Sequence, residues 1–177
     1  MSALGPDGEI HCALQHKHEL PLIVYHEDCN AILADPMRNQ SGPEHKRAYQ
    51  NIHDDFTKRG FKTQLQRLNN KASEILRSYL AAETVDYQFA PPGIHRRNAA
   101  KCAIRTFKDQ FIAGLYGTDP ESPLHLWDRL PPQALLTLKL LRELSLNPHV
   151  SSYAQIHSAF NFKRTSLAPP GTRVVVH

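Results

Sequence analysis

Two early stretches of the chain have the short apolar runs of β-strands, and most of the remainder repeats its apolar residues at helical spacing. Residues 20–27 (LPLIVYHE) and 30–36 (NAILADP) are the strand-like stretches, and only Asp28 and Cys29 separate them. So short a connection between two strands predicts an antiparallel hairpin. Asp28 is then a turn residue rather than a catalytic acid.

A helix is predicted directly after the hairpin. Ser41-Gly42-Pro43-Glu44 has the pattern of a capping box with proline in the first turn, which is typical of a helix N-terminus. Apolar residues then follow at helical spacing as far as Gly60, where we expect the helix to end. His53 falls at the edge of the apolar face.

A second unit follows in which two strands flank a helix. Residues 62–68 alternate like a strand, and residues 85–90 (VDYQFA) have strand composition. Between them, residues 71–82 repeat apolar side chains on one helical face, namely Ile75, Leu76, Tyr79 and Leu80. This order predicts a parallel strand pair joined by a right-handed crossover.

The strongest local pattern is a helix that begins near Asn98, a good N-cap after the non-helical Pro91-Pro92-Gly93. One arc of this helix is apolar and predicts a buried face, formed by Ala100, Ala103, Ile104, Phe107 and Phe111. A neighbouring arc is basic, formed by Arg97, Lys101, Arg105 and Lys108. Lys101 falls in the first turn, where the helix dipole disfavours a cation, so helix stability does not explain it.

The expected fold class is α/β, an RNase H-like mixed sheet with an antiparallel hairpin plus a parallel β-α-β unit, flanked by helices; the order alone also fits other α/β folds. Ile75, Leu80, Ile104 and Phe107 are the expected core positions. A leucine-rich helix at 131–146 and a helix within 151–160 follow. We expect a degenerate segment with a weak strand at 1–19, one domain at 20–160, and a truncated, extended tail at 161–177.

Composition narrows the function classes only slightly. The chain has 177 residues, 41% of them hydrophobic, which is enough for one sizeable core. A net charge of +4 allows a polyanionic partner without requiring one. Three cysteines without a CxxC pair, and His11, His16 and His18 without a second ligand pair, predict neither disulfides nor a metal site. With no apolar run long enough for a membrane and no signal peptide, we expect an intracellular protein of the nucleus or cytoplasm, not a secreted one.

One run of the chain is similar to a known family. HRRNAAKCAIRTFKDQFIAGL, residues 95–115, resembles the last catalytic helix of the integrase core in Copia-type retrotransposon polyproteins, which reads close to HRRNAAERAIRTFKNHFIAGL. LNNKAS at 68–73 resembles the family run LDNEAS, and residues from His125 to the end resemble the segment that follows the core. The resemblance covers about residues 20–177.

The resemblance implies an RNase H-like fold and an origin in DNA integration, but not an intact active site. The three acids of the family align with Ala13, Asn69 and Lys101, the last two separated by 32 positions as in the family. Such acids hold Mg²⁺, which requires anionic oxygen ligands, and these three residues supply none. We therefore expect no cofactor and a core that is not an active polynucleotidyl transferase, although the alignment of Ala13 leaves an active enzyme open.

Nucleic-acid binding depends on contacts with phosphate groups and not on metal ligands, so it can persist after the acids are lost. The candidate nucleic-acid-binding residues are Arg96, Arg97, Lys101, Arg105 and Lys108. A solvated basic helix face explains the same pattern equally well. The alternative from another class is a structural or protein-interaction module that uses the leucine-rich helix at 131–146, with a second copy of the chain or another protein as its partner.

Overall fold

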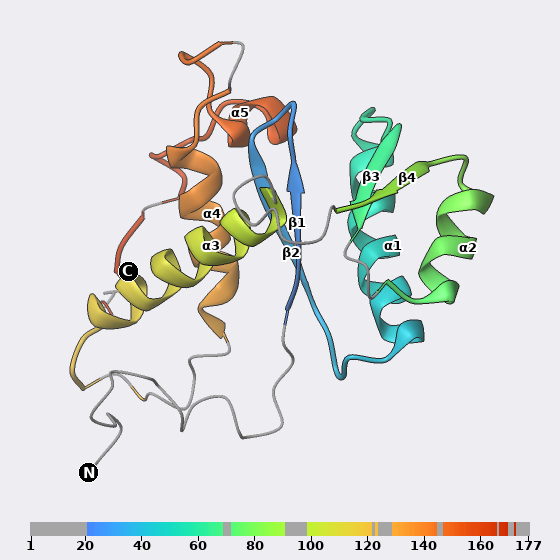
Figure 1. Cartoon of the computed structure of the whole chain (residues 1–177). Coiled ribbons are helices and arrows are strands. Elements are labelled where there is room, and N and C mark those ends of the chain that lie inside the picture. Colours follow the sequence, from blue (N-terminus) through green and yellow to red (C-terminus); the bar gives the residue numbers. More distant parts are fainter. Residues whose placement is uncertain are drawn as a thin grey trace.

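The computed structural model of the chain describes residues 21–68, 72–90, 99–121, 123, 129–144, 147–165, 167–169 and 172. In chain order these residues form β1 (Pro21–His26), β2 (Ala31–Pro36), α1 (Gly42–Lys58), β3 (Leu65–Leu68), α2 (Glu74–Ala82), β4 (Asp86–Phe89), α3 (Ala99–Tyr116), α4 (Pro131–Leu141) and α5 (Ser152–His157) (Figure 1). None of these helices is long and apolar enough to cross a membrane.

The hairpin of β1 and β2 lies between two layers of helices (Figure 1). The strands pair antiparallel from Pro21↔Pro36 to His26↔Ala31, which confirms the predicted hairpin. Because side chains of a strand alternate between its faces, Leu22 and Val24 pack on the side of α1, whereas Ile23 contacts the cluster formed with α3 and α4. The hairpin therefore holds α3 on the face opposite α1.

The predicted β-α-β unit is also confirmed. β3 and β4 pair in parallel from Leu65↔Asp86 to Leu68↔Phe89, and α2 connects them. The side chain of Ser73 caps α2 by accepting a 3.3 Å hydrogen bond from the N–H of Leu76. Within the described residues the antiparallel and parallel pairs form two separate two-stranded sheets. The fold class predicted from the sequence, α/β with both kinds of strand pair and flanking helices, is the one observed.

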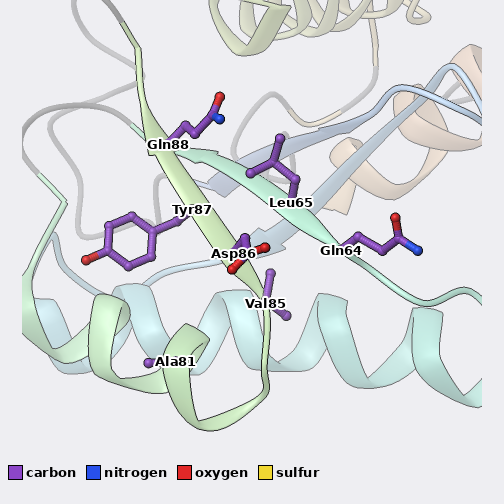
Figure 2. A pocket seen from close by; sticks show the side chains of 7 residues that line it. All are labelled: Gln64, Leu65, Ala81, Val85, Asp86, Tyr87 and Gln88. Carbon is purple, nitrogen blue, oxygen red and sulfur yellow. The ribbon is translucent and has the colours of Figure 1, made fainter.

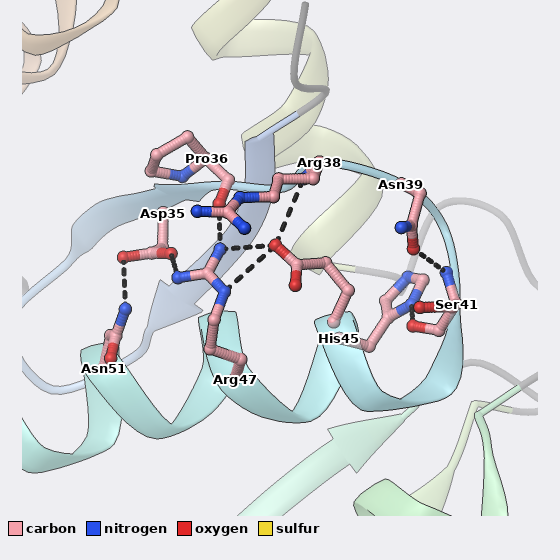
Figure 3. A network of polar contacts seen from close by, with 9 residues as sticks. Asp35, Pro36, Arg38, Asn39, Ser41, His45, Arg47 and Asn51 are labelled. Carbon is pink, nitrogen blue, oxygen red and sulfur yellow. Dashed lines mark hydrogen bonds and ion pairs between the residues drawn. The ribbon is translucent and has the colours of Figure 1, made fainter.

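The start of α1 agrees with the sequence in position but not in its contacts (Figure 3). Ser41 is the N-cap residue, yet its side chain makes no capping hydrogen bond. The Glu44 carboxylate instead accepts hydrogen bonds from the N–H of Arg38, at 3.1 Å, and from Nε of Arg47, at 2.9 Å. Arg47 also donates to Asp35, at 3.1 Å, and so ties the helix to the end of β2. The predicted capping box is wrong because the arginine takes the glutamate away from the helix end.

Two of the four predicted core positions are buried and two are not. Leu80 is fully buried and Phe107 is nearly so, whereas 43% of Ile75 and 38% of Ile104 are exposed. Ile75 lies about 90° around α2 from the centre of its buried face, and Ile104 lies at the margin of the buried arc of α3. The prediction for these two isoleucines is therefore wrong, because the helices bury narrower stripes than their full apolar arcs.

The last helices are tied to the turn of the hairpin. Arg142 donates from Nε to the carbonyl of Asn30, at 2.8 Å, and the side chain of Asn30 donates to the carbonyl of Glu143, at 2.7 Å. Ser152 is fully buried, and its hydroxyl contacts the carbonyls of Cys29 and Asn30. α4 ends at Leu141 rather than at 146 because Arg142 leaves the helical conformation and reaches this turn. The helix predicted at 131–146 therefore extends five residues too far.

Candidate nucleic-acid interface

α3 packs firmly against the hairpin and α4. Ala103 and Phe107 are buried against Ile32 of the hairpin and against Ala134 and Leu138 of α4. The ring of Phe107 stacks on that of Phe111 with 6.1 Å between centroids and 14° between planes. With one side of the helix packed in this way, the direction of its other side is fixed.

The outward side of α3 carries the predicted basic residues. Lys101, Arg105 and Lys108 are all exposed. At about 100° per residue they fall within a sector of about 60°, roughly opposite Ala103. Arg105 is 85% exposed and lies 3.8 Å from the carboxylate of Asp109, one turn further along. The predicted basic face is therefore solvent-accessible along the first half of the helix.

The structure brings together only part of the predicted nucleic-acid-binding set. Arg96 and Arg97 lie outside the described residues, so their contribution to the basic face stays a prediction. Lys101 is the third residue of α3, within its first turn, where the sequence placed it. The N-cap prediction for Asn98 also falls outside the described part of the chain.

The three positions aligned with catalytic acids do not supply a metal site in the residues that can be described. Ala13 and Asn69 lie outside them, although Asn69 directly follows Leu68, the last residue of β3. In the described ranges no group of three His, Cys, Asp or Glu side chains is placed to hold a metal ion. Glu74 forms an ion pair with Arg77, and Asp109 lies beside Arg105. Of the three aligned positions only Lys101 is described, and its ammonium carries the wrong charge for a Mg²⁺ ligand.

A shallow cavity of about 610 Å³ lies beside the parallel strands (Figure 2). Its lining comes from the beginning of β3 and β4, the residues just before them and the end of α2, namely Gln64, Leu65, Ala81, Val85, Asp86, Tyr87 and Gln88. The position aligned with a catalytic acid follows the opposite end of β3. Asp86 is the one carboxylate in the lining, so the cavity lacks the convergent acids that phosphoryl transfer needs.

The described cysteines give no nucleophile. Burial, helped by the nearby charge of Asp28, raises the pKa of Cys29 to about 11, so its thiol stays protonated at neutral pH. Cys102 is exposed on α3.

Sequence reasoning missed a cluster of charged residues where α1, α4 and α5 meet. Arg59, which follows α1, donates from Nε to the carboxylate of Asp55 at 3.0 Å. Burial lowers the pKa of Lys139 on α4 and of His157 on α5, and the nearby guanidinium of Arg59 lowers both further. Three basic side chains thus surround one acid. No local sequence pattern signals this cluster, because its members come from three separate helices.

Comparison with solved structures identifies the fold. The chain is similar to the catalytic core domain of BIV integrase, with a TM-score of 0.54 and 9% sequence identity over 76% of this chain and 82% of that one. It is also similar to the HTLV-2 integrase catalytic core domain, solved with magnesium in a dimeric form, with a TM-score of 0.51 and 14% identity over 78% of this chain and 93% of that one. The chain has the fold of an integrase catalytic core. No protein-family model and no curated protein matches the sequence.

Proposed function

We propose that the chain is a degenerate integrase core of a Copia-type retroelement polyprotein, which binds nucleic acid and no longer catalyses DNA integration. The observation that carries the proposal is the position of Lys101 on the integrase-like fold. It is exposed in the first turn of α3, the helix whose sequence resembles the last catalytic helix of that family. A retroelement origin explains why a cation occupies a helix N-terminus that favours anions.

The loss of catalysis follows from the chemistry of the side chains. Mg²⁺ in such sites is bound mainly by carboxylates. Ala13 offers no ligand, Asn69 offers only a neutral carbonyl oxygen, and the ammonium of Lys101 repels a cation. Among the described acids near these positions in sequence, Glu74 is engaged by Arg77 and Asp109 lies two turns further along α3, so neither replaces the lost ligands. We therefore derive no step through a metal ion for this chain.

Nucleic-acid binding is supported by the exposure of the basic face. Lys101, Arg105 and Lys108 project from a helix whose opposite side is buried, so phosphate groups can approach them without rearrangement of the core. Lysine and arginine side chains neutralise the phosphates of a duplex, and the release of counterions supplies the affinity. Replacement of the family's glutamate by Lys101 makes the face more basic.

A duplex-binding titration tests this function. The double variant Arg105→Gln/Lys108→Gln should bind a labelled duplex more weakly, and the slope of log affinity against log salt should fall by about 2, roughly one unit for each phosphate contact. A matched control, Arg38→Gln/Lys58→Gln, removes the same charge from exposed positions elsewhere. Equal salt slopes for the two double variants would show that only net charge matters and would refute a site on α3.

The alternative, an interaction module built on the leucine-rich helix, is less well supported by the packing. Ala134 and Leu138 of α4 are buried within the chain itself, and Leu135 packs against the same cluster. Leu141 remains 70% exposed at the end of the helix. A homo-oligomer stays a proposal that size-exclusion chromatography with light scattering tests, and a Leu141→Ser variant that dissociates an oligomer would favour this alternative.

A further inference from the structure

We propose that the aromatic cluster of Tyr153, His157, Phe160 and Phe162 is a stacking site for the unpaired bases of a single-stranded nucleic acid. The cluster lies on α5 and the residues just after it (Figure 1). It is separate in sequence from the basic face of α3. The inference concerns single strands, whereas the proposal for α3 concerns duplexes.

The rings form one connected series. His157 lies 4.7 Å from Tyr153 between centroids, with 32° between the ring planes. Phe160 meets Tyr153 edge to face at 5.1 Å, and Phe162 meets Phe160 edge to face at 4.7 Å. Contacts of this kind hold each ring in place. Phe162 ends the series with 62% of its surface exposed, so a flat base has room to stack on it.

The turn that carries Phe162 is fixed by its own hydrogen bonds. The side-chain oxygen of Asn161 accepts from the N–H groups of Lys163 and Arg164, both at 3.0 Å. The carbonyl of Asn161 accepts from the N–H of Thr165 at 3.1 Å. Phe162 is thus held between its neighbours by the turn, and a base that stacks on it need not order a mobile loop first.

The charge around the rings favours a polyanion over a protein surface. Lys163 and Arg164 are exposed directly beside Phe162. Arg59 and Lys139 place positive charge near His157, and the acid near them, Asp55, is hydrogen-bonded to Arg59. From residue 144 to residue 177 the sequence contains no aspartate or glutamate. A single-strand site combines an aromatic ring on which a base stacks with cations for the phosphates, and the exposed ring of Phe162 beside Lys163 and Arg164 supplies both.

The test uses the full chain and a fluorescently labelled oligothymidylate of about 12 nucleotides, within the usual site size of single-strand binders, beside a duplex of equal length. The Phe162→Ala variant should bind the single strand about tenfold more weakly, the order expected for loss of one stacked base, with unchanged duplex binding. Phe162→Trp should retain the single-strand affinity. The matched control is Phe89→Ala, which truncates an exposed ring that pairs with Tyr87 on β4.

Several outcomes would overturn the inference. One is a native chain that does not bind the oligothymidylate, and another is a Phe162→Ala variant that binds it as tightly as the native chain does. A third is a Phe162→Ala variant that changes the oligomeric state instead, since the rings would then cover a second copy of the chain. A fourth is an Arg105→Gln/Lys108→Gln variant that weakens single-strand binding as much as Phe162→Ala does, since the cluster would then not be a site of its own. The two proposals can fail independently. The effect of Arg105→Gln/Lys108→Gln on duplex binding tests the proposed function, and the effect of Phe162→Ala on single-strand binding tests this inference.

Discussion

Replacing Ser152 by alanine removes the hydroxyl that ties α5 to the turn of the hairpin. Ser152 is fully buried, and its Oγ contacts the carbonyl of Cys29 and, at 3.0 Å, that of Asn30. A hydroxyl carries one proton, so it donates to one of the two carbonyls at a time. The carbonyl of Asn30 keeps a second donor in the variant, Nε of Arg142 at 2.8 Å. The loss therefore falls mainly on the carbonyl of Cys29.

The expected cost is about 2 kcal/mol of unfolding free energy. A net hydrogen bond contributes about 1 kcal/mol, and a buried acceptor left without a donor costs about 1–3 kcal/mol. The middle of this range applies, about 2 kcal/mol, because removal of one oxygen atom leaves only a small void and the neighbouring carbonyl stays paired. For a chain of this size, that loss lowers the melting temperature by about 4–8 °C.

Urea unfolding followed by circular dichroism measures the change. Ser78→Ala is the matched control, because it removes a hydroxyl from an exposed position of α2 and should leave stability unchanged within about 0.5 kcal/mol. A Ser152→Ala variant as stable as the control would refute the reasoning. It would mean that the residues after α4 do not fold as part of the core.

Two further predictions concern the core and the hairpin. Leu80→Ala should lower the unfolding free energy by about 2–5 kcal/mol because Leu80 is fully buried, whereas Ile75→Ala should cost under about 1 kcal/mol; equal losses in urea unfolding would contradict the observed packing of α2. Burial lowers the pKa of His26 below its ordinary value of 6.5, despite the opposing charges of Asp28 and Glu27, so its contribution to stability is full above pH 6.5 and is lost as the pH falls below it. Thermal melts between about pH 7 and pH 5 should show a shallower decline for His26→Gln than for the native chain, and parallel curves would count against this effect.

The elements that sequence predicts best are those whose causes are local. The hairpin depends on two strand-like runs and a short turn, and the β-α-β unit depends on alternation and helical spacing over consecutive residues. The start of α1 was placed correctly for the same reason. Its capping contacts were not, because Arg47 reaches Glu44 and Asp35 at once and no pattern within the first turn shows this.

Contacts between distant parts of the chain could not be predicted. Arg142 and Asn30 are 112 positions apart, and their hydrogen bond ends α4 five residues before its apolar pattern does. The cluster of Arg59, Lys139 and His157 likewise forms only when three helices meet. By contrast, the place of Lys101 in the first turn of α3 was predicted from the sequence, because helical spacing within one segment determines it.

Calorimetric titration with Mg²⁺ tests the central claim, an integrase-core fold that has lost its metal chemistry. The native chain is compared with a variant that restores the family's acids, Ala13→Asp/Asn69→Asp/Lys101→Glu. The proposal predicts no saturable binding to the native chain and saturable binding to the restored variant, because the three restored carboxylates would supply the anionic oxygen ligands that Mg²⁺ requires. Saturable Mg²⁺ binding by the native chain that survives substitution of Asn69 would contradict the account, since the acids that hold the ion would then lie elsewhere.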